Sequence, residues 1–204
     1  MLKSLNGLVF SPFIKSKSDG KKLAFLALLT AFNVICNSFL EIKTLDVQFS
    51  FTIVVSMASG IILGPLSGGI VCLLADFIGY VINSWGYLYM PWVGLSTGVL
   101  AFISGLVFKG EYKNWVAKCI FVCFLSLTVC TILINSTGFY FYNKAMGFST
   151  AVLNYVSSRF GKDVGYFTYL IYRLIFKGQI YNSLFNYCLL FLLVPILKRL
   201  KVIF

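Results

Sequence analysis

Residues 49–82 read FSFTIVVSMASGIILGPLSGGIVCLLADFIGYVI, and this stretch decides the fold. It carries a single charged side chain, Asp76. Gly64 and Pro65 interrupt it near the middle, and this pair favours a tight connection because proline cannot continue a helix. The runs are continuously apolar, without the ten-residue alternation of a membrane barrel, so they favour helices. The stretch therefore predicts a hairpin of two membrane helices.

The composition of the whole chain is that of a membrane protein. Of its 204 residues, 59% are hydrophobic and 11% are charged, with a mean hydropathy of +0.91, whereas a soluble domain has about 25% charged residues. Apolar runs occur at 23–40, 49–64, 67–83, 91–108, 115–141 and 179–197. A membrane span takes about 20 residues. We therefore predict an all-α integral membrane protein, a compact bundle of six transmembrane helices whose second and third members are short and packed against protein.

The basic residues predict the topology. Most of the 17 Lys and Arg side chains lie before the first apolar run, between the fourth and fifth, and after the last. Such a bias places both termini in the cytoplasm. The expected organisation is a basic cytoplasmic segment at 1–22, a six-helix membrane domain at 23–197 and a basic cytoplasmic tail at 198–204. This distribution explains the net charge of +11 by membrane topology, so we expect the lipid bilayer, and no nucleic acid, as the partner of the basic residues.

The connection at about 142–178 is long and rich in Tyr and Phe. Long connections in compact proteins are usually functional or disordered, and this aromatic content argues against disorder. We predict a pair of short helices at the outer interface. Whether residues 142–165 form a lid stays open.

Several kinds of chemistry lack the residues they need. The chain has no His and only six Asp and Glu, so a catalytic triad or a His metal site is not expected. Its six Cys never form C-x-x-C, and we expect neither a metal nor a cofactor. No phosphate-binding G-x-x-x-x-G-K-[ST] motif occurs. We therefore expect neither an enzyme nor an ATPase, and leave Asp76 open between a structural and a functional role.

Ligand-type side chains gather at the outer ends of the predicted helices. They would suit a planar heterocycle carrying carboxylates, with Trp or Tyr for stacking, Asn for its edges and Arg for its acid groups. An aromatic belt at the membrane interface is the alternative explanation for part of the set. The candidates are Asn37, Asp46, Asn83, Trp85, Tyr87, Tyr89, Trp92, Asn135, Tyr169, Arg173 and Lys177.

The first predicted helix carries small residues at Ala24, Ala27 and Ala31. Ala27 and Ala31 are four apart and therefore share one helix face. Such a strip lets another helix approach closely. From spacing alone, packing inside the bundle and docking of a partner are both possible.

Three stretches resemble the substrate-binding (S) components of energy-coupling factor (ECF) vitamin transporters, most closely their folate family. Residues 49–82 resemble the second and third helices around a GP…GG…AD..G pattern, and residues 91–108 (PWVGLSTGVLAFISGLVF) resemble the fourth. Residues 169–178 (YLIYRLIFKG) place Arg173 and Lys177 on the family's Arg and Lys.

The resemblance implies a subunit of a bacterial cell membrane that captures a water-soluble vitamin, folate or a related pterin, from outside. It implies delivery inward together with a transmembrane coupling subunit and two cytoplasmic ATPases. Ala27 and Ala31 match the strip on which the family docks the coupling subunit.

The chain departs from the folate pattern at several positions. Asn37 stands where an Arg is common, Ser136-Thr137-Gly138 where a Trp is expected, and Tyr172 where Pro precedes the Arg. The alternatives are therefore the same class with another ligand, such as a queuosine precursor or riboflavin, or a self-sufficient carrier of small solutes. A membrane-embedded enzyme is disfavoured by the shortage of acids and His.

Overall fold

A computed structural model of the chain describes residues 8–44, 47–84, 88–109, 114–161 and 163–203. Three of the predicted site residues, Asp46, Trp85 and Tyr87, lie outside the described residues.

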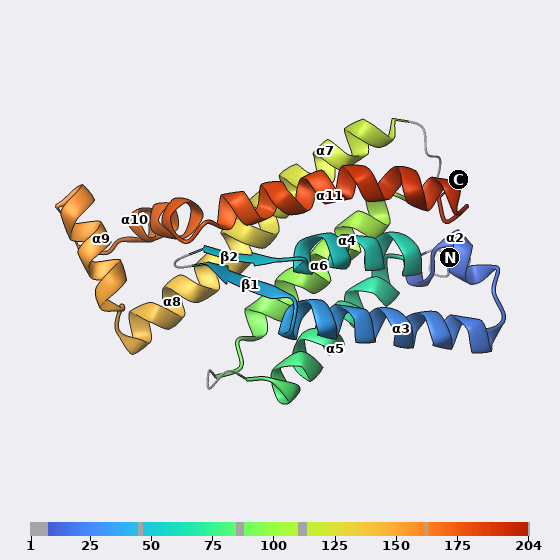
Figure 1. Cartoon of the computed structure of the whole chain (residues 1–204), viewed down its shortest axis with the longest axis horizontal. Helices are drawn as coiled ribbons and strands as arrows, with labels where there is room; N and C mark the ends of the chain where they lie inside the picture. Colours follow the sequence, from blue (N-terminus) through green and yellow to red (C-terminus); the bar gives the residue numbers. More distant parts are fainter. Residues whose placement is uncertain (1–7, 45–46, 85–87, 110–113, 162, 204) are drawn as a thin grey trace.

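The body is a bundle of helices that run along the long axis of the molecule (Figure 1). Each predicted apolar run falls on a helix or a continuous series of helices, so the predicted fold class is confirmed. They are α3 (Asp19–Ser38), α4 (Thr52–Leu63), α5 (Pro65–Ile82), α6 (Pro91–Val107), the series α7 (Trp115–Leu125), η1 (Ser126–Ser136) and α8 (Thr137–Met146), and α11 (Gln179–Arg199).

Three segments of the described chain are long and apolar enough to cross a membrane, namely Pro65–Ile82, Trp115–Met146 and Gln179–Arg199, while α4 and α6 are shorter apolar helices. The prediction that α4 is short and packed against protein is confirmed, because most of its side chains are buried. The prediction for the third helix is wrong in length. Pro65 occupies the first position of α5, where a proline is favourable because its missing N–H needs no partner, so α5 starts earlier than predicted and is long enough to span.

The predicted hairpin between α4 and α5 is confirmed. Its turn is at Gly64, whose φ of +107° is a conformation that L side chains rarely adopt. The short helix α2 (Pro12–Lys15) covers this turn, with Ile14 fully buried. The backbone N–H of Ser11 donates to the Leu63 carbonyl at 2.8 Å. The segment before α3 is therefore packed onto the bundle.

Helices α4, α5 and α6 approach one another at the level of their backbones. A Cβ added at Gly60 would collide with the Ala101 carbonyl and the Ser104 hydroxyl, and one added at Gly68 would lie 2.6 Å from the Gly60 Cα. The Ser104 hydroxyl also donates to the Met57 carbonyl at 3.0 Å. Small residues thus replace side-chain packing here, as is common between membrane helices.

A two-stranded antiparallel hairpin follows α3, and the sequence did not predict it. Strands β1 (Glu41–Thr44) and β2 (Val47–Ser50) pair in a register that sets Glu41 opposite Ser50. Two asparagines of α11 hold the end of this hairpin. The Ser50 N–H donates to the Asn182 side-chain oxygen and the Val54 N–H to that of Asn186, both at 3.0 Å.

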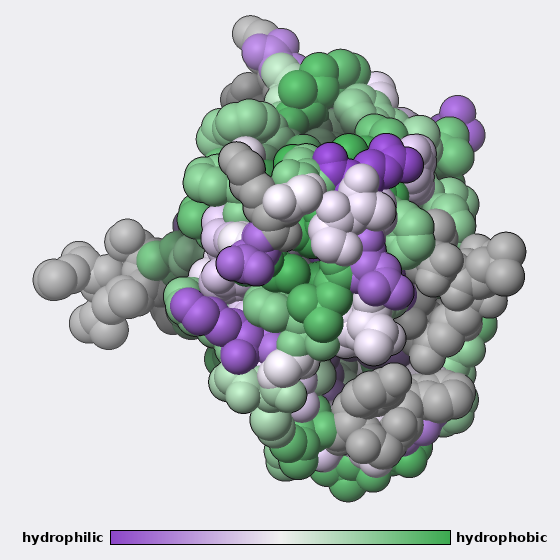
Figure 2. Space-filling view, turned by 90° about the vertical axis from the view of Figure 1, so that its left-hand side faces the viewer, coloured by the Kyte–Doolittle hydropathy of each residue, from purple (hydrophilic) through white to green (hydrophobic). Residues whose placement is uncertain are grey.

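The long connection forms a lobe of α8, α9 (Thr150–Phe160), α10 (Tyr166–Ile171) and η2 (Tyr172–Phe176). The predicted short helices are present, and their location at the outer interface, after which we call this part the outer lobe, stays a prediction. Buried Val152 and Val156 of α9 pack on a cluster with Tyr140, Tyr169 and Tyr172. The lobe lies at the end of the molecule opposite to both chain termini (Figure 1). Seen from the lobe end, separate groups of hydrophilic side chains lie around a hydrophobic patch near the middle of the face, and further hydrophobic side chains lie at its margins (Figure 2).

Candidate functional site

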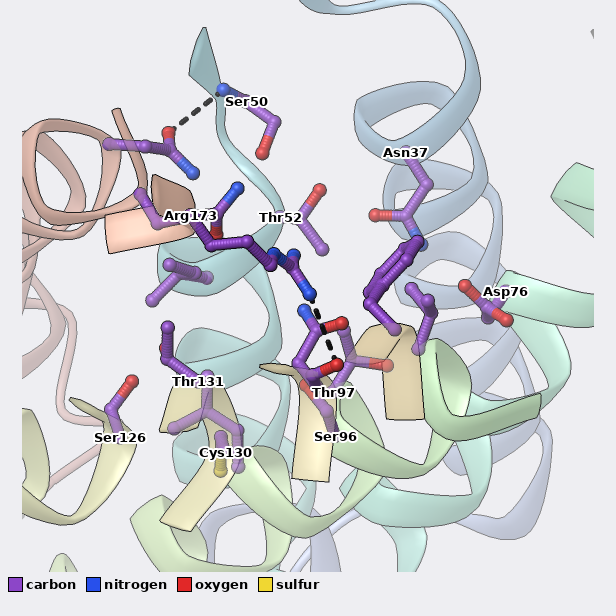
Figure 3. A pocket seen from close by; sticks show the side chains of 17 residues that line it. Asn37, Ser50, Thr52, Asp76, Ser96, Thr97, Ser126, Cys130, Thr131 and Arg173 are labelled. Carbon is purple, nitrogen blue, oxygen red and sulfur yellow. Dashed lines mark hydrogen bonds between the residues drawn. The ribbon is translucent and has the colours of Figure 1, made fainter. Parts of the chain in front are cut away.

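A polar cavity of about 250 Å³ lies between the body and the outer lobe, among α3, α5, α6, η1, η2 and α11 (Figure 3). Most of the lining side chains carry a hydroxyl, amide or charged group. These polar residues are Asn37, Ser50, Thr52, Asp76, Ser96, Thr97, Ser126, Thr131, Asn135, Arg173, Gln179 and Asn182. A concentration of polar groups inside an otherwise apolar bundle indicates a binding site, because burying them unpaired is costly.

Two further chambers adjoin this central cavity. The lobe chamber, about 220 Å³, shares Phe139, Arg173 and Gln179 with it and is also lined by Tyr169 and Lys177 among others. The side chamber, about 190 Å³, shares Asn37, Asp76 and Val93 and lies between α3, α5 and the start of α6. Ligand pockets commonly occupy about 300–1,000 Å³. A vitamin-sized molecule would therefore extend from the central cavity into at least one chamber.

Arg173 is a buried cation at the border of the central cavity and the lobe chamber. Its side chain is 8% exposed, its Nη1 donates to the Asn135 carbonyl at 3.1 Å, and its guanidinium lies 4.1 Å from the centre of the Phe139 ring. Within the described ranges, no carboxylate forms an ion pair with it. Burial lowers the pKa of Arg173 to about 10, so it remains charged at neutral pH. A buried cation without an acidic partner is costly unless an anion joins it.

Asp76 provides the opposite charge from α5. It lines both the central cavity and the side chamber, and Tyr89 lines the same side chamber. Burial, and then the Asp76 charge, raise the pKa of Tyr89, so this hydroxyl remains a donor at neutral pH. Gly94 of α6 makes room for the carboxylate, since a Cβ there would be 2.7 Å from its Oδ2.

Two amide oxygens in the lining have no partner among the described residues. The Oδ1 atoms of Asn37 and Asn135 are both buried and unpaired. A buried acceptor without a hydrogen bond costs about 1–3 kcal/mol. These atoms thus point to a ligand that carries N–H or O–H donors.

The π-helix η1 brings its polar side chains to the cavity. Ser126, Thr131 and Asn135 all line it, at spacings near the wide turn of a π-helix and not that of an α-helix. The Ser136 hydroxyl donates to the carbonyl of Thr131, five residues earlier, at 2.7 Å. An α-helical phase would scatter these residues around the helix, and the sequence analysis did not include Ser126 and Thr131.

The structure brings most of the described candidates to one site. Asn37, Asn135 and Arg173 line the central cavity. Asn83 and Tyr89 line the side chamber, and Tyr169 and Lys177 line the lobe chamber.

Trp92 lines none of the three spaces. Its ring packs 5.8 Å from the rings of Phe139 and Tyr142, and its Nε1 is buried without a partner among the described residues. Trp92 therefore supports Phe139, on whose ring Arg173 lies. The aromatic residue at the cavity wall is Phe139, which the sequence analysis did not single out.

Asn182 was also missed, although it lines the cavity and holds the hairpin. Its side-chain oxygen accepts from Ser50 and also from the Asn186 amide at 3.2 Å. The signal was present as two asparagines four residues apart in an apolar helix. They share one face, and polar residues within membrane segments are usually functional or paired.

The alanine strip lies away from the cavity. Ala24, Ala27 and Ala31 are all exposed on α3. A separate, wholly apolar groove of about 470 Å³ runs between α3, α4 and α11, lined by Phe32, Leu40 and Leu192 among others and not by these alanines. The strip is therefore not used for packing within the described part of the chain.

Comparisons with known proteins agree with this architecture. Residues 17–176 match the family described as ECF-type riboflavin transporter, S component. A curated relative, the folate transporter FolT of Clostridium novyi (strain NT), is 30% identical over 115 residues; the match covers 56% of this chain and 63% of that transporter, less than two thirds of its length.

Two solved structures share the fold. One, described as a crystal structure of FolT bound with folic acid, has a TM-score of 0.61 at 21% identity and covers 86% of this chain and 93% of its own. The other, described as the S component of a bacterial ECF transporter, has a TM-score of 0.55 at 17% identity and covers 90% and 99%.

Proposed function

Since this chain belongs to the family of ECF-type riboflavin transporter S components, we propose that it captures folate or a related pterin outside the cell for delivery inward. The family makes it a membrane-embedded transporter subunit. The ligand is our inference, and it rests on the charge and hydrogen-bonding groups of the cavity together with the similarity to FolT.

The proposal depends mainly on the buried, positively charged side chain of Arg173. A buried guanidinium at the border of two chambers, with no acidic partner among the described residues, favours an anionic ligand. Folate carries carboxylates at one end and a flat ring at the other. Lys177 lines the same chamber and adds a second positive charge for the acidic tail.

The ring would occupy the central cavity. The unpaired oxygens of Asn37 and Asn135 suit the N–H groups at the edge of a pterin, and Phe139 offers a flat aromatic wall. Trp85 and Tyr87 remain candidates for stacking on the ring or covering it, Asp46 remains a candidate for ligand contact, and Trp92 supports the wall from behind.

For transport, the chain would depend on partners. We place both termini in the cytoplasm, so the lobe and the cavity mouth face outward. The exposed Ala24, Ala27 and Ala31 would receive a transmembrane coupling subunit, which in turn is driven by two ATPases.

The ligand proposal is tested by titrating the purified protein with folic acid, riboflavin and 7-aminomethyl-7-deazaguanine, a queuosine precursor, in isothermal calorimetry. We expect folic acid to bind tightest, because riboflavin carries no acid group for Arg173. Tight binding of riboflavin or the deazaguanine together with weak binding of folic acid would overturn the ligand and leave the family unaffected.

The docking proposal is tested with Ala27→Leu, which places a large side chain on the strip. Folic acid binding and thermal stability should match the wild type, since Ala27 is exposed and is not part of the cavity lining. Co-purification with the coupling subunit and vitamin uptake should both be lost. The matched control is Ala117→Leu, an exposed alanine on α7; equal loss in both variants would contradict a specific strip on α3.

A further inference from the structure

The cavity system is electrically polarised. Asp76 is shared between the central cavity and the side chamber, whereas Arg173 is shared between the central cavity and the lobe chamber. They enter from different elements, α5 and η2, and Figure 3 draws Asp76 and Arg173 on different sides of the lining. A ligand in the central cavity therefore meets a carboxylate at one end and a guanidinium at the other.

Asp76 has unused capacity to accept hydrogen bonds. A carboxylate offers about four acceptor positions, and Tyr89 shares the side chamber with it. Within the described ranges no Lys or Arg forms an ion pair with Asp76. Gly94 lets the carboxylate lie directly against α6. The unpaired Oδ1 of Asn37 lines the same two spaces and adds another acceptor.

A carboxylate that shares a cavity with a second acceptor favours a ligand with adjacent N–H donors. The 2-amino-4-oxopyrimidine edge of a pterin has this pattern, because its ring N–H and exocyclic amino group lie side by side and point in one direction. The matching edge of a flavin has one N–H between two carbonyl groups. Those carbonyl oxygens would face the Asp76 oxygens without a proton between them.

We propose that Asp76 determines ligand specificity by accepting two N–H bonds from an aminopyrimidinone edge, which orients the ring toward α5 and the acidic tail toward η2. This inference rests on the proposed function and adds to it the direction in which the ligand lies. It also accounts for a charged side chain in the middle of an apolar helix, which is costly to insert unless it has a role.

The test compares folic acid with 2-desaminofolic acid, which lacks only the exocyclic amino group, on wild-type protein and on Asp76→Asn. We expect the wild type to prefer folic acid by roughly 10- to 150-fold, the usual worth of a hydrogen bond to a charged group. Asp76→Asn presents an amide in place of one oxygen, so it should bind folic acid more weakly by a similar factor and bind the two compounds nearly equally.

The matched control is Asp163→Asn, an exposed acid outside the cavity, which should keep the full preference. The wild-type comparison needs no variant and stays decisive if Asp76→Asn fails to fold. Equal binding of both compounds by the wild type, or an unchanged preference in Asp76→Asn, would overturn the role of Asp76 while leaving folate binding in place. Tight binding of riboflavin with no binding of folic acid would overturn this role and the proposed ligand together.

Discussion

The body and the outer lobe border the same cavity but are packed differently: helices of the body meet at glycines, whereas the lobe is packed through aromatic rings. In the body, α4, α5 and α6 meet backbone to backbone at Gly60 and Gly68. In the lobe, rings pack on rings, with Tyr140 5.7 Å from Tyr169 and Tyr172 stacked 5.4 Å from Phe176. Backbone contacts leave no adjustable atoms, whereas side chains can repack. The body therefore fixes the Asp76 end of the cavity, and the lobe can adapt the Arg173 end.

The largest effect is expected in the body, from Gly60→Ala. The added methyl would collide with the Ala101 carbonyl and the Ser104 hydroxyl, so the helices must separate. We expect a loss of more than about 3 kcal/mol in the free energy of unfolding, measured by thermal unfolding in detergent. Gly20→Ala is the control, because a Cβ at Gly20 has nothing within 4 Å; similar stability of both variants would contradict backbone packing of the body.

The next effect concerns the Arg173 end, through Arg173→Gln. The variant removes the cation that attracts the ligand's acid groups, so we expect folic acid affinity to fall by about 1.5–3 kcal/mol. The unfolding temperature of the ligand-free protein should stay equal or rise, because a buried charge without a described acidic partner is removed. Arg159→Gln, at an exposed arginine of α9, is the control and should change neither quantity. A large loss of stability without loss of affinity would assign Arg173 a purely structural role.

A third variant tests the junction between the hairpin and the body, Asn186→Leu. The Asn186 amide donates to the Ser50 carbonyl at 2.8 Å and its oxygen accepts from the Val54 N–H, so leucine leaves both backbone groups unpaired. The expected cost is about 1–3 kcal/mol of unfolding free energy. Thermal unfolding beside Asn154→Leu, an exposed site of α9, measures it. No difference between the two variants would mean that the hairpin is held by other contacts.

The fold was largely predictable from the sequence because it follows from hydrophobicity and helix breakers. The Gly64-Pro65 break, the six apolar runs and the aromatic connection predicted the main helices, and the family match confirms the S-component class. The hairpin β1–β2 was not predictable, since its last residues are held by Asn182 and Asn186, more than a hundred residues later in the chain.

The site was predictable only in part. Asn37, Asn135 and Arg173 stand out as polar residues near helix ends, and all three line the cavity. Ser126 and Thr131 depend on the π-helical phase of η1, which a pattern search at 3.6 residues per turn does not follow. Trp92 is the opposite case: it was predicted to bind the ligand, but its ring packs against Phe139 and Tyr142 and does not line the cavity.

The smallest effect is expected in the lobe, from Val156→Ala. Val156 is fully buried against the tyrosine cluster, and removing two methyl groups should cost about 1.5 kcal/mol, less than the body variant because neighbouring rings can shift into the space. Hydrogen exchange should become faster in α9 and α10 and stay unchanged in α4–α6. Leu153→Ala, at a position 45% exposed on the same helix, should leave exchange unaltered. Faster exchange in α4–α6 would show that lobe and body form one rigid unit, and the adaptable Arg173 end would then lose its basis.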